Sequence, residues 1–264
     1  MSGTGSWTKL LLIGLGTGFL AGLMGVGGGV VMIPAMVLLL KIDQHTAHGT
    51  SLAIMIVIAT AAAAAYALNG AVNWPIAATL IPGTLAGAFI GARLASRVPA
   101  RQLTLLFSVF VLITGATMVH EGMAGADVAA PAGVAAHAGI VWGLAVGLLS
   151  GCLGGLLGVG GGIVMVPALA LGPGFAQQVC QGTSLVAIIA TAISGALTHN
   201  AAGNMDRRAA IGLAAGGLPG SLAGSAVAIS MPGAHLTATF GVFLIVMSAL
   251  IAYPALRAQQ GTGR

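Results

Sequence analysis

Charged side chains are scarce in this sequence: only 5% of its 264 residues are Asp, Glu, Lys or Arg. A soluble domain carries about 25% charged residues, so the composition excludes an ordinary soluble globular protein. A helix that spans a bilayer needs roughly 20 mostly apolar residues. The stretches without any charge are about that long or longer and predict an all-α polytopic membrane protein: 10–40, 44–92, 102–120, 128–205 and 209–256.

Acidic residues and cysteines are rarer still. None of the four Asp and Glu residues lies in an apolar segment, and Cys152 and Cys180 have neither a CxxC partner nor metal-ligand spacing. The apolar segments therefore lack a nucleophile–base pair or metal ligands for catalysis, and the sequence predicts no enzyme, no cofactor and no metal site. The nine Lys and Arg residues are scattered between apolar segments, which relates them to membrane topology and predicts no nucleic-acid partner.

The chain consists of two homologous halves. GLMGVGGGVVMIPA (22–35) returns 133 residues later as GLLGVGGGIVMVPA (155–168), with 11 of 14 positions identical. GTSL (49–52) recurs at the same spacing, whereas PGTLAG (82–87) recurs as PGSLAG 137 residues later, which indicates a four-residue insertion. Such repeats are typical of secondary transporters. We predict a first half at 9–119, a linker at 120–137 and a second half at 138–256.

Polar, glycine and proline signals divide the two halves into eight apolar segments. These are 9–40, 46–68, 74–96, 102–119, 138–171, 180–200, 208–230 and 234–256. If the first segment of each half enters the membrane and returns without crossing, all nine Lys and Arg residues fall on one side, as the positive-inside rule requires. This predicts inverted repeats. A plain topology with eight crossings and parallel halves is the alternative.

A glycine run interrupts the first segment of each half. Glycine costs about 1 kcal/mol relative to alanine in a helix, so GVGGG predicts a break, as a re-entrant or discontinuous helix. Pro34 and Pro167 follow the runs and fit the beginning of a new half-helix. From Gly29 to Leu40 such a half-helix would be roughly 18 Å long, which places its first residue near the bilayer midplane.

Two half-helix N-termini that meet in the membrane would bind an anion without any Lys or Arg. Their first backbone N–H groups have no helical partner and carry about half a positive charge. The alternative is a structural role, in which the glycines only permit close helix packing. That alternative describes two other glycine stripes well, at positions 14, 18 and 22 and at positions 143, 147 and 151.

Polar residues beside GTSL extend the candidate site. His48 precedes Thr50 and Ser51, and its counterpart at spacing 133 is Gln181. His48 is a candidate proton carrier because histidine titrates near physiological pH, with a satisfied histidine at the headgroup level as the alternative. His199, late in its segment, is assigned to the membrane interface. The predicted substrate-binding residues are Gly25, Gly27, Gly28, Gly29, His48, Thr50, Ser51, Gly158, Gly160, Gly161, Gly162, Gln181, Thr183 and Ser184.

These motifs resemble one family. GLMGVGGGVVMIPAMVLL with GTSL, then Gly70-x-Val72-Asn73-Trp74 and PGTLAGAFIGARLA, is similar to the TauE/SafE sulfite exporters, bacterial membrane transporters. The resemblance covers about residues 10 to 252 and departs from the pattern at Asn204-Met205-Asp206. It implies transport of small sulfur-containing anions, such as sulfite, sulfonates or thiosulfate, across the bacterial inner (cytoplasmic) membrane.

The sequence therefore predicts a secondary transporter that exports such anions by alternating access around the paired half-helix N-termini. A passive anion channel and a proton-coupled importer of the same anions are the alternatives. The expected partners are the small anion and the lipid bilayer, and a homodimer is left open.

Overall fold

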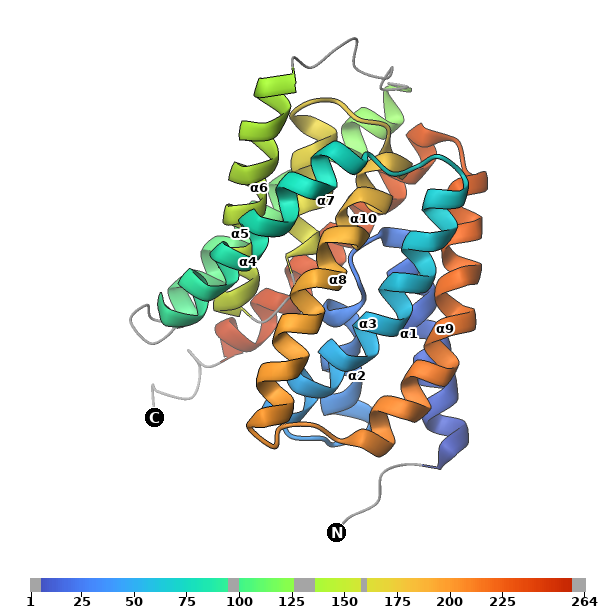
Figure 1. The fold of residues 1–264 in the computed structure, drawn as a ribbon, viewed down its shortest axis with the longest axis vertical. Helices are drawn as coiled ribbons and strands as arrows, with labels where there is room; N and C mark the ends of the chain where they lie inside the picture. Colours follow the sequence, from blue (N-terminus) through green and yellow to red (C-terminus); the bar gives the residue numbers. More distant parts are fainter. Residues whose placement is uncertain (1–5, 95–99, 126–135, 158–160, 258–264) are drawn as a thin grey trace.

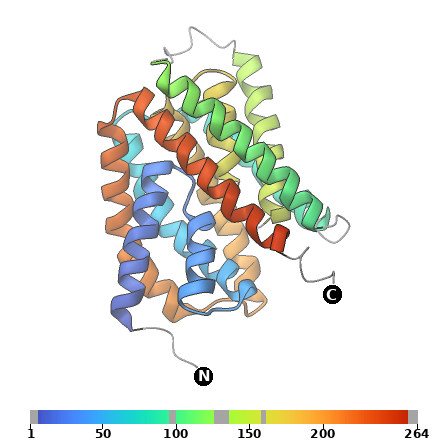
Figure 2. The same cartoon turned by 180° about the vertical axis from the view of Figure 1, so that it is seen from behind.

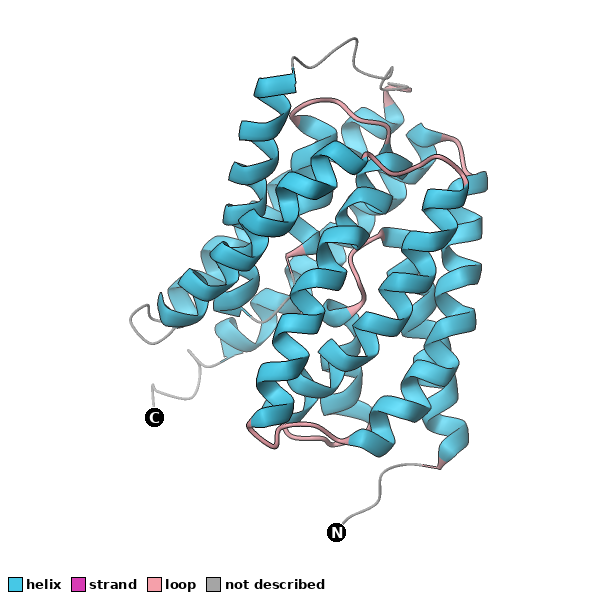
Figure 3. Ribbon diagram, in the orientation of Figure 1, coloured by secondary structure: helices cyan, strands magenta, loops and turns pink. Residues whose placement is uncertain are grey.

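The computed structural model describes residues 6–94, 100–125, 136–157 and 161–257. Within these ranges the chain forms ten helices and no strand, which confirms the predicted all-α class (Figures 1 and 3). The helices of the first half are α1 (Trp7–Met24), α2 (Gly29–Leu39), α3 (Gln44–Leu68), α4 (Trp74–Leu94) and α5 (Ala100–Met123). Those of the second half are α6 (Ala136–Leu157), α7 (Gly162–Leu171), α8 (Gln177–Ala201), α9 (Arg207–Ser230) and α10 (Gly233–Arg257).

Eight of these helices are long and apolar enough to cross a membrane. The two exceptions are α2 with 11 residues and α7 with 10, which follow the glycine runs. Helices of that length rise about 15 to 17 Å, roughly half the hydrocarbon thickness of a bilayer. The chain is therefore a multi-pass membrane protein in which each half begins with one long and one short helix.

The long and the short helix of each half form a hairpin. Figure 2 shows α1 rising from the N-terminal end of the molecule and α2 turning back toward that end. In Figure 1, α6 descends from the opposite end and α7 returns to it.

Each end of the molecule gathers segments from both halves. At one end the guanidinium of Arg208, at the start of α9, lies 5.7 Å from the ring centroid of Trp7, at the start of α1. At the other end the amide of Gln178, at the start of α8, donates to the carbonyl of Met231 in the turn between α9 and α10, at 2.9 Å. Figure 1 shows that α1 begins at the first of these ends and α6 at the second.

The most extensive helix contacts all join one half to the other. Helix α1 packs on α9, α6 on α4, α5 on α10 and α3 on α8. Exchanging the two halves converts the first pair into the second and leaves the third and fourth unchanged. The halves are therefore interleaved and share one apolar core.

Glycine stripes permit the two closest contacts. A methyl group added to any stripe glycine of α1 would overlap the backbone of α9. In α6, it would overlap the backbone of α4 at Gly147 and Gly151, and the side chain of Thr79 at Gly143. Helices with such stripes approach backbone to backbone, as small-xxx-small patterns do in membranes. The prediction of close packing is confirmed for the glycines that face Leu213, Gly217 and Ser221 (Gly14, Gly18 and Gly22) and for those that face Thr79, Leu80 and Thr84 (Gly143, Gly147 and Gly151).

Aspartate caps outside the apolar spans begin two of the helices. The carboxylate of Asp43 accepts from the backbone N–H groups of His45 and Thr46, at 3.0 and 3.2 Å, and begins α3. Hydrogen bonds from the side chain and the backbone of Thr46 hold the pKa of Asp43 below its usual value, so its charge faces the positive end of α3. Asp206 caps α9 in the same way through the N–H of Ala209, at 3.0 Å.

Candidate functional site

The first glycine run is a non-helical tip between α1 and α2. Gly25, Gly27 and Gly28 have φ of 68°, 74° and 82°, a region that glycine adopts at no steric cost. Helix α2 begins where the N–H of Met32 donates to the carbonyl of Gly28, at 2.8 Å. In the second half, Gly161 (φ 73°) holds the same place before α7. The predicted site residues Gly158 and Gly160 lie outside the described residues.

The first tip lies in direct contact with the N-terminal end of α7. A methyl group added to Gly162, the first residue of α7, would lie 2.8 Å from the Cα of Val26 in the first tip. One added to Gly27 would lie 2.7 Å from a methyl group of Ile188 in α8. Val26 is fully buried. The fold therefore brings the N-termini of α2 and α7 together, each with N–H groups that have no helical partner.

Thr50 and Thr183 join the two halves. The Thr50 hydroxyl accepts from the backbone N–H of Asp206 at 3.0 Å, and the Thr183 hydroxyl accepts from that of Asn73 at 2.9 Å. Both threonines are buried. Thr50 of the first half thus holds the turn before α9, and Thr183 of the second half holds the turn before α4, in addition to any role toward a substrate.

The first tip is closed by side chains of α3 and α8. The Ser184 hydroxyl donates to the carbonyl of Gly25 at 2.6 Å. The Tyr66 hydroxyl lies 2.9 Å from the carbonyl oxygen of Gly22 and 2.8 Å from Oε1 of Gln181, so its single proton is shared between two acceptors. Sequence reasoning missed Tyr66. The repeat could have found it, because Tyr66 is the counterpart of His199 at spacing 133.

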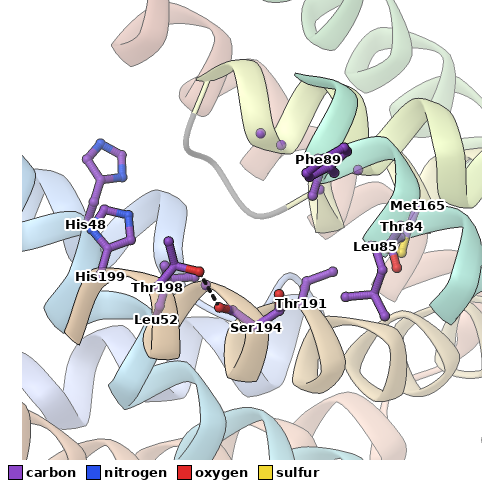
Figure 4. A pocket seen from close by; sticks show the side chains of 16 residues that line it. His48, Leu52, Thr84, Leu85, Phe89, Met165, Thr191, Ser194, Thr198 and His199 are labelled. Atoms are coloured by element: carbon purple, nitrogen blue, oxygen red, sulfur yellow. Dashed lines mark hydrogen bonds between the residues drawn. The ribbon is translucent and has the colours of Figure 1, made fainter. Parts of the chain in front are cut away.

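The second tip borders a cavity of about 370 Å³. Gly161 lies on its wall, and Figure 4 shows His48 and His199 together at one end of it. A methyl group on Gly49 would lie 2.8 Å from Cβ of His199, which confirms that the start of α3 and the end of α8 adjoin. The remaining polar side chains on the wall are Thr84, Thr191, Ser194 and Thr198. A cavity of this size and mixed lining suits a small ligand.

Two histidines line this cavity, and the wall residues that the structure describes include no carboxylate. The guanidinium of Arg93 lies 3.9 Å from the ring centroid of Phe89, a wall residue. His199, which the sequence assigned to the membrane interface, is also part of the wall. The described side chains include no group of three or more His, Cys, Asp and Glu residues that could hold a metal ion.

Ser51 is buried one turn after His48. Its hydroxyl donates to the carbonyl of His48 in its own helix, at 2.8 Å. Of the predicted site residues that the structure describes, Gly161 and His48 line the cavity. Gln181 and Ser184 instead contact Gly25 in the closed first tip.

Comparison with known proteins places the chain in a family. The family profile described as "Sulfite exporter TauE/SafE" matches residues 2–118 and 143–264. The chain belongs to the TauE/SafE family. The predicted resemblance is thereby confirmed, and this TauE/SafE protein is a membrane transporter, in agreement with the expectation that it is not an enzyme.

Curated relatives of this TauE/SafE protein carry matching names. A "Probable membrane transporter protein YunE" of Bacillus subtilis (strain 168) is 25% identical over 272 residues, covering 95% of this chain and 99% of the relative. A "Probable membrane transporter protein" of Xylella fastidiosa (strain Temecula1) is 28% identical over 253 residues, covering 92% and 94%. One from Haemophilus influenzae is 27% identical over 258 residues, covering 90% and 95%. No solved structure matches the chain.

Proposed function

We propose that this chain is a secondary transporter that moves small sulfur-containing anions, such as sulfite, sulfonates or thiosulfate, across the bacterial inner membrane by alternating access. The contact between the first tip, which leads into α2, and the N-terminal end of α7, beside a cavity lined by His48, carries this proposal. The family described as sulfite exporters supports the substrate class.

The anion would bind to the free N–H groups at the two half-helix N-termini. Each N-terminus carries about half a positive charge, and glycine lets a ligand approach the backbone closely. The side chains that line the cavity in the described part of the chain include no Lys or Arg. A site built from dipoles and neutral donors holds an anion without a full opposing charge, which suits a ligand that must also leave.

Inverted repeats would supply the two states of alternating access. The hairpins α1–α2 and α6–α7, which begin at different ends of the molecule, support this topology (Figures 1 and 2). The exchange of packing partners between the halves supports it as well. The end that carries Lys9, Lys41, Arg93, Arg207 and Arg208 would face the cytoplasm under the positive-inside rule.

Export needs no further driving force under this proposal. An inside-negative membrane potential favours exit of an anion by about 2.3 kcal/mol per charge per 100 mV. Proton-coupled uptake of the same anions is the second candidate function. It is favoured by one observation, that the titratable side chain of His48 lines the cavity.

Counterflow in proteoliposomes tests the proposal. Vesicles preloaded with unlabelled sulfite should take up labelled sulfite faster than empty vesicles or vesicles preloaded with sulfate, and the uptake should saturate. Flux that never saturates and ignores internal sulfite would identify a passive channel. Absence of flux for sulfite, thiosulfate and organosulfonates would refute the substrate class. A proton gradient that accelerates uptake in the wild type and not in His48→Gln would favour the importer.

A further inference from the structure

The two halves of the transporter differ where the repeat makes them equivalent. At spacing 133, His48 corresponds to Gln181, His199 to Tyr66, and Gln44 to Gln177. The first member of each pair is at least partly accessible, and both histidines line the cavity. Tyr66 and Gln181 have 0% of their surface exposed and Gln177 has 3%. One side of the pseudo-symmetric molecule is therefore open and the equivalent side is closed.

Direct packing closes the first tip. A methyl group on Gly25 would lie 2.6 Å from Cα and 2.8 Å from Cγ of Gln181, so the tip and α8 are in contact. The Tyr66 hydroxyl stabilises this contact, because it lies within hydrogen-bond distance of both the Gln181 amide oxygen and the carbonyl of Gly22. The first tip therefore packs directly on Gln181, whose amide oxygen is bonded to Tyr66.

The closed side contains amide groups without partners. Both amide atoms of Gln177, and Nε2 of Gln181, are buried and make no hydrogen bond to any described part of the chain. The two glutamines are four residues apart in α8, on one face of the helix. Buried polar groups in native proteins are almost always hydrogen-bonded. Three unbonded amide atoms on one face of α8 therefore point to a ligand that these side chains bind in another conformation.

We infer that Gln177 and Gln181 are the ligand-binding residues of a second substrate site, at the first glycine tip, which Tyr66 closes in this conformation. The site opens toward the end of the molecule opposite the basic residues. It takes an oxyanion, because glutamine amides supply N–H donors without a charge and the N-terminus of α2 lies at the same tip. This inference rests on the proposed function, since it assigns the outer half of the same transport cycle.

Thiol labelling tests, without any transported substrate, whether Tyr66 closes access to the second site. Gln177→Cys and its matched counterpart Gln44→Cys are made in a chain in which Cys152 and Cys180 are replaced by alanine. A membrane-impermeant methanethiosulfonate should label position 44 rapidly from the basic side and position 177 slowly from the opposite side. Tyr66→Phe should accelerate labelling at position 177 by about 2- to 10-fold, the value of one hydrogen bond. Tyr253→Phe, an exposed tyrosine, is the control.

Labelling at position 177 from the basic side, or at a rate that Tyr66→Phe leaves unchanged in a folded variant, would overturn the inference. Sulfite uptake then tests the ligand. Gln181→Leu should raise the KM for sulfite at the outer face by about 2- to 10-fold, with a smaller effect at the basic face. His48→Leu should show the reverse preference. Equal effects at both faces would refute a second site, whereas absence of sulfite flux in every variant would refute the proposed function alone.

Discussion

The hydroxyl of Thr50 in the first half accepts a hydrogen bond from the backbone N–H of Asp206 in the second half, at 3.0 Å. Its counterpart Thr183 does the same for Asn73, at 2.9 Å. The two contacts are reciprocal, because both pairs are related by the repeat spacing of 133. The threonine of each GTSL motif therefore fixes the turn before a membrane helix of the other half.

Replacing Thr50 with valine should destabilise the protein. The variant keeps the shape of the side chain and leaves the N–H of Asp206 without its acceptor, which costs about 1–3 kcal/mol. Thr50→Ser should retain most of the stability because the hydroxyl remains. Thermal unfolding of the purified protein in detergent measures both. A Thr50→Val variant of wild-type stability that no longer transports would instead make Thr50 a substrate ligand.

Gly18 should tolerate no side chain, whereas Gly16 in the same helix should accept one. A methyl group on Gly18 meets the backbone of Gly217 in α9, so Gly18→Ala should cost about 1–3 kcal/mol or prevent folding. Gly16 has no atom within 4 Å of the added carbon, and Gly16→Ala should stabilise α1 by about 0.5–1 kcal/mol. The yield and melting temperature of the two variants decide the prediction, and equal destabilisation would contradict it.

The inverted topology predicts opposite accessibility for two equivalent turns. Asn69 after α3 and Ala202 after α8 are both exposed and are related by the spacing of 133. In a cysteine-free chain, Asn69→Cys should react with an impermeant thiol reagent only from outside the cell. Ala202→Cys should react only from the cytoplasmic side, in inverted vesicles. Labelling of both positions from one side would establish the parallel arrangement of the halves.

Filling the cavity should abolish transport and leave the fold intact. Ser194 lines the cavity and is exposed, so tryptophan at this position can be accommodated by occupying the space beside the second tip. Ile193 is the matched control, since it is the next residue of α8, is exposed, and does not belong to the cavity wall. Counterflow should be lost in Ser194→Trp and retained in Ile193→Trp. Equal activity of the two variants would remove the cavity from the transport path.

Composition and local chemistry determined much of this protein. A chain with 5% charged residues can bury its apolar segments only in a bilayer, where helices satisfy the backbone internally. The glycine runs predicted where helix would end, and α1 does stop at Met24 and α2 begin at Gly29. The segment bounds were also close, with α3 beginning at Gln44 instead of residue 46 and α8 at Gln177 instead of residue 180. Helix breaks and segment bounds depend on residues that are neighbours in the sequence, so they can be predicted from the sequence.

Only the tertiary structure decided which residues the two halves share. Tyr66 and Gln181 are 115 positions apart and Thr50 and Asp206 are 156 apart, and no local pattern links either pair. The repeat is symmetric in sequence, yet among the tip residues that the structure describes only Gly161, of the second tip, lines the cavity, because Tyr66 and Gln181 close the first. Such contacts arise from how helices of both halves pack together. The periodicity of apolar residues in one helix does not identify the helix that packs against it. For this reason the sequence pointed to the glycine tips, and the fold added His199 and Tyr66.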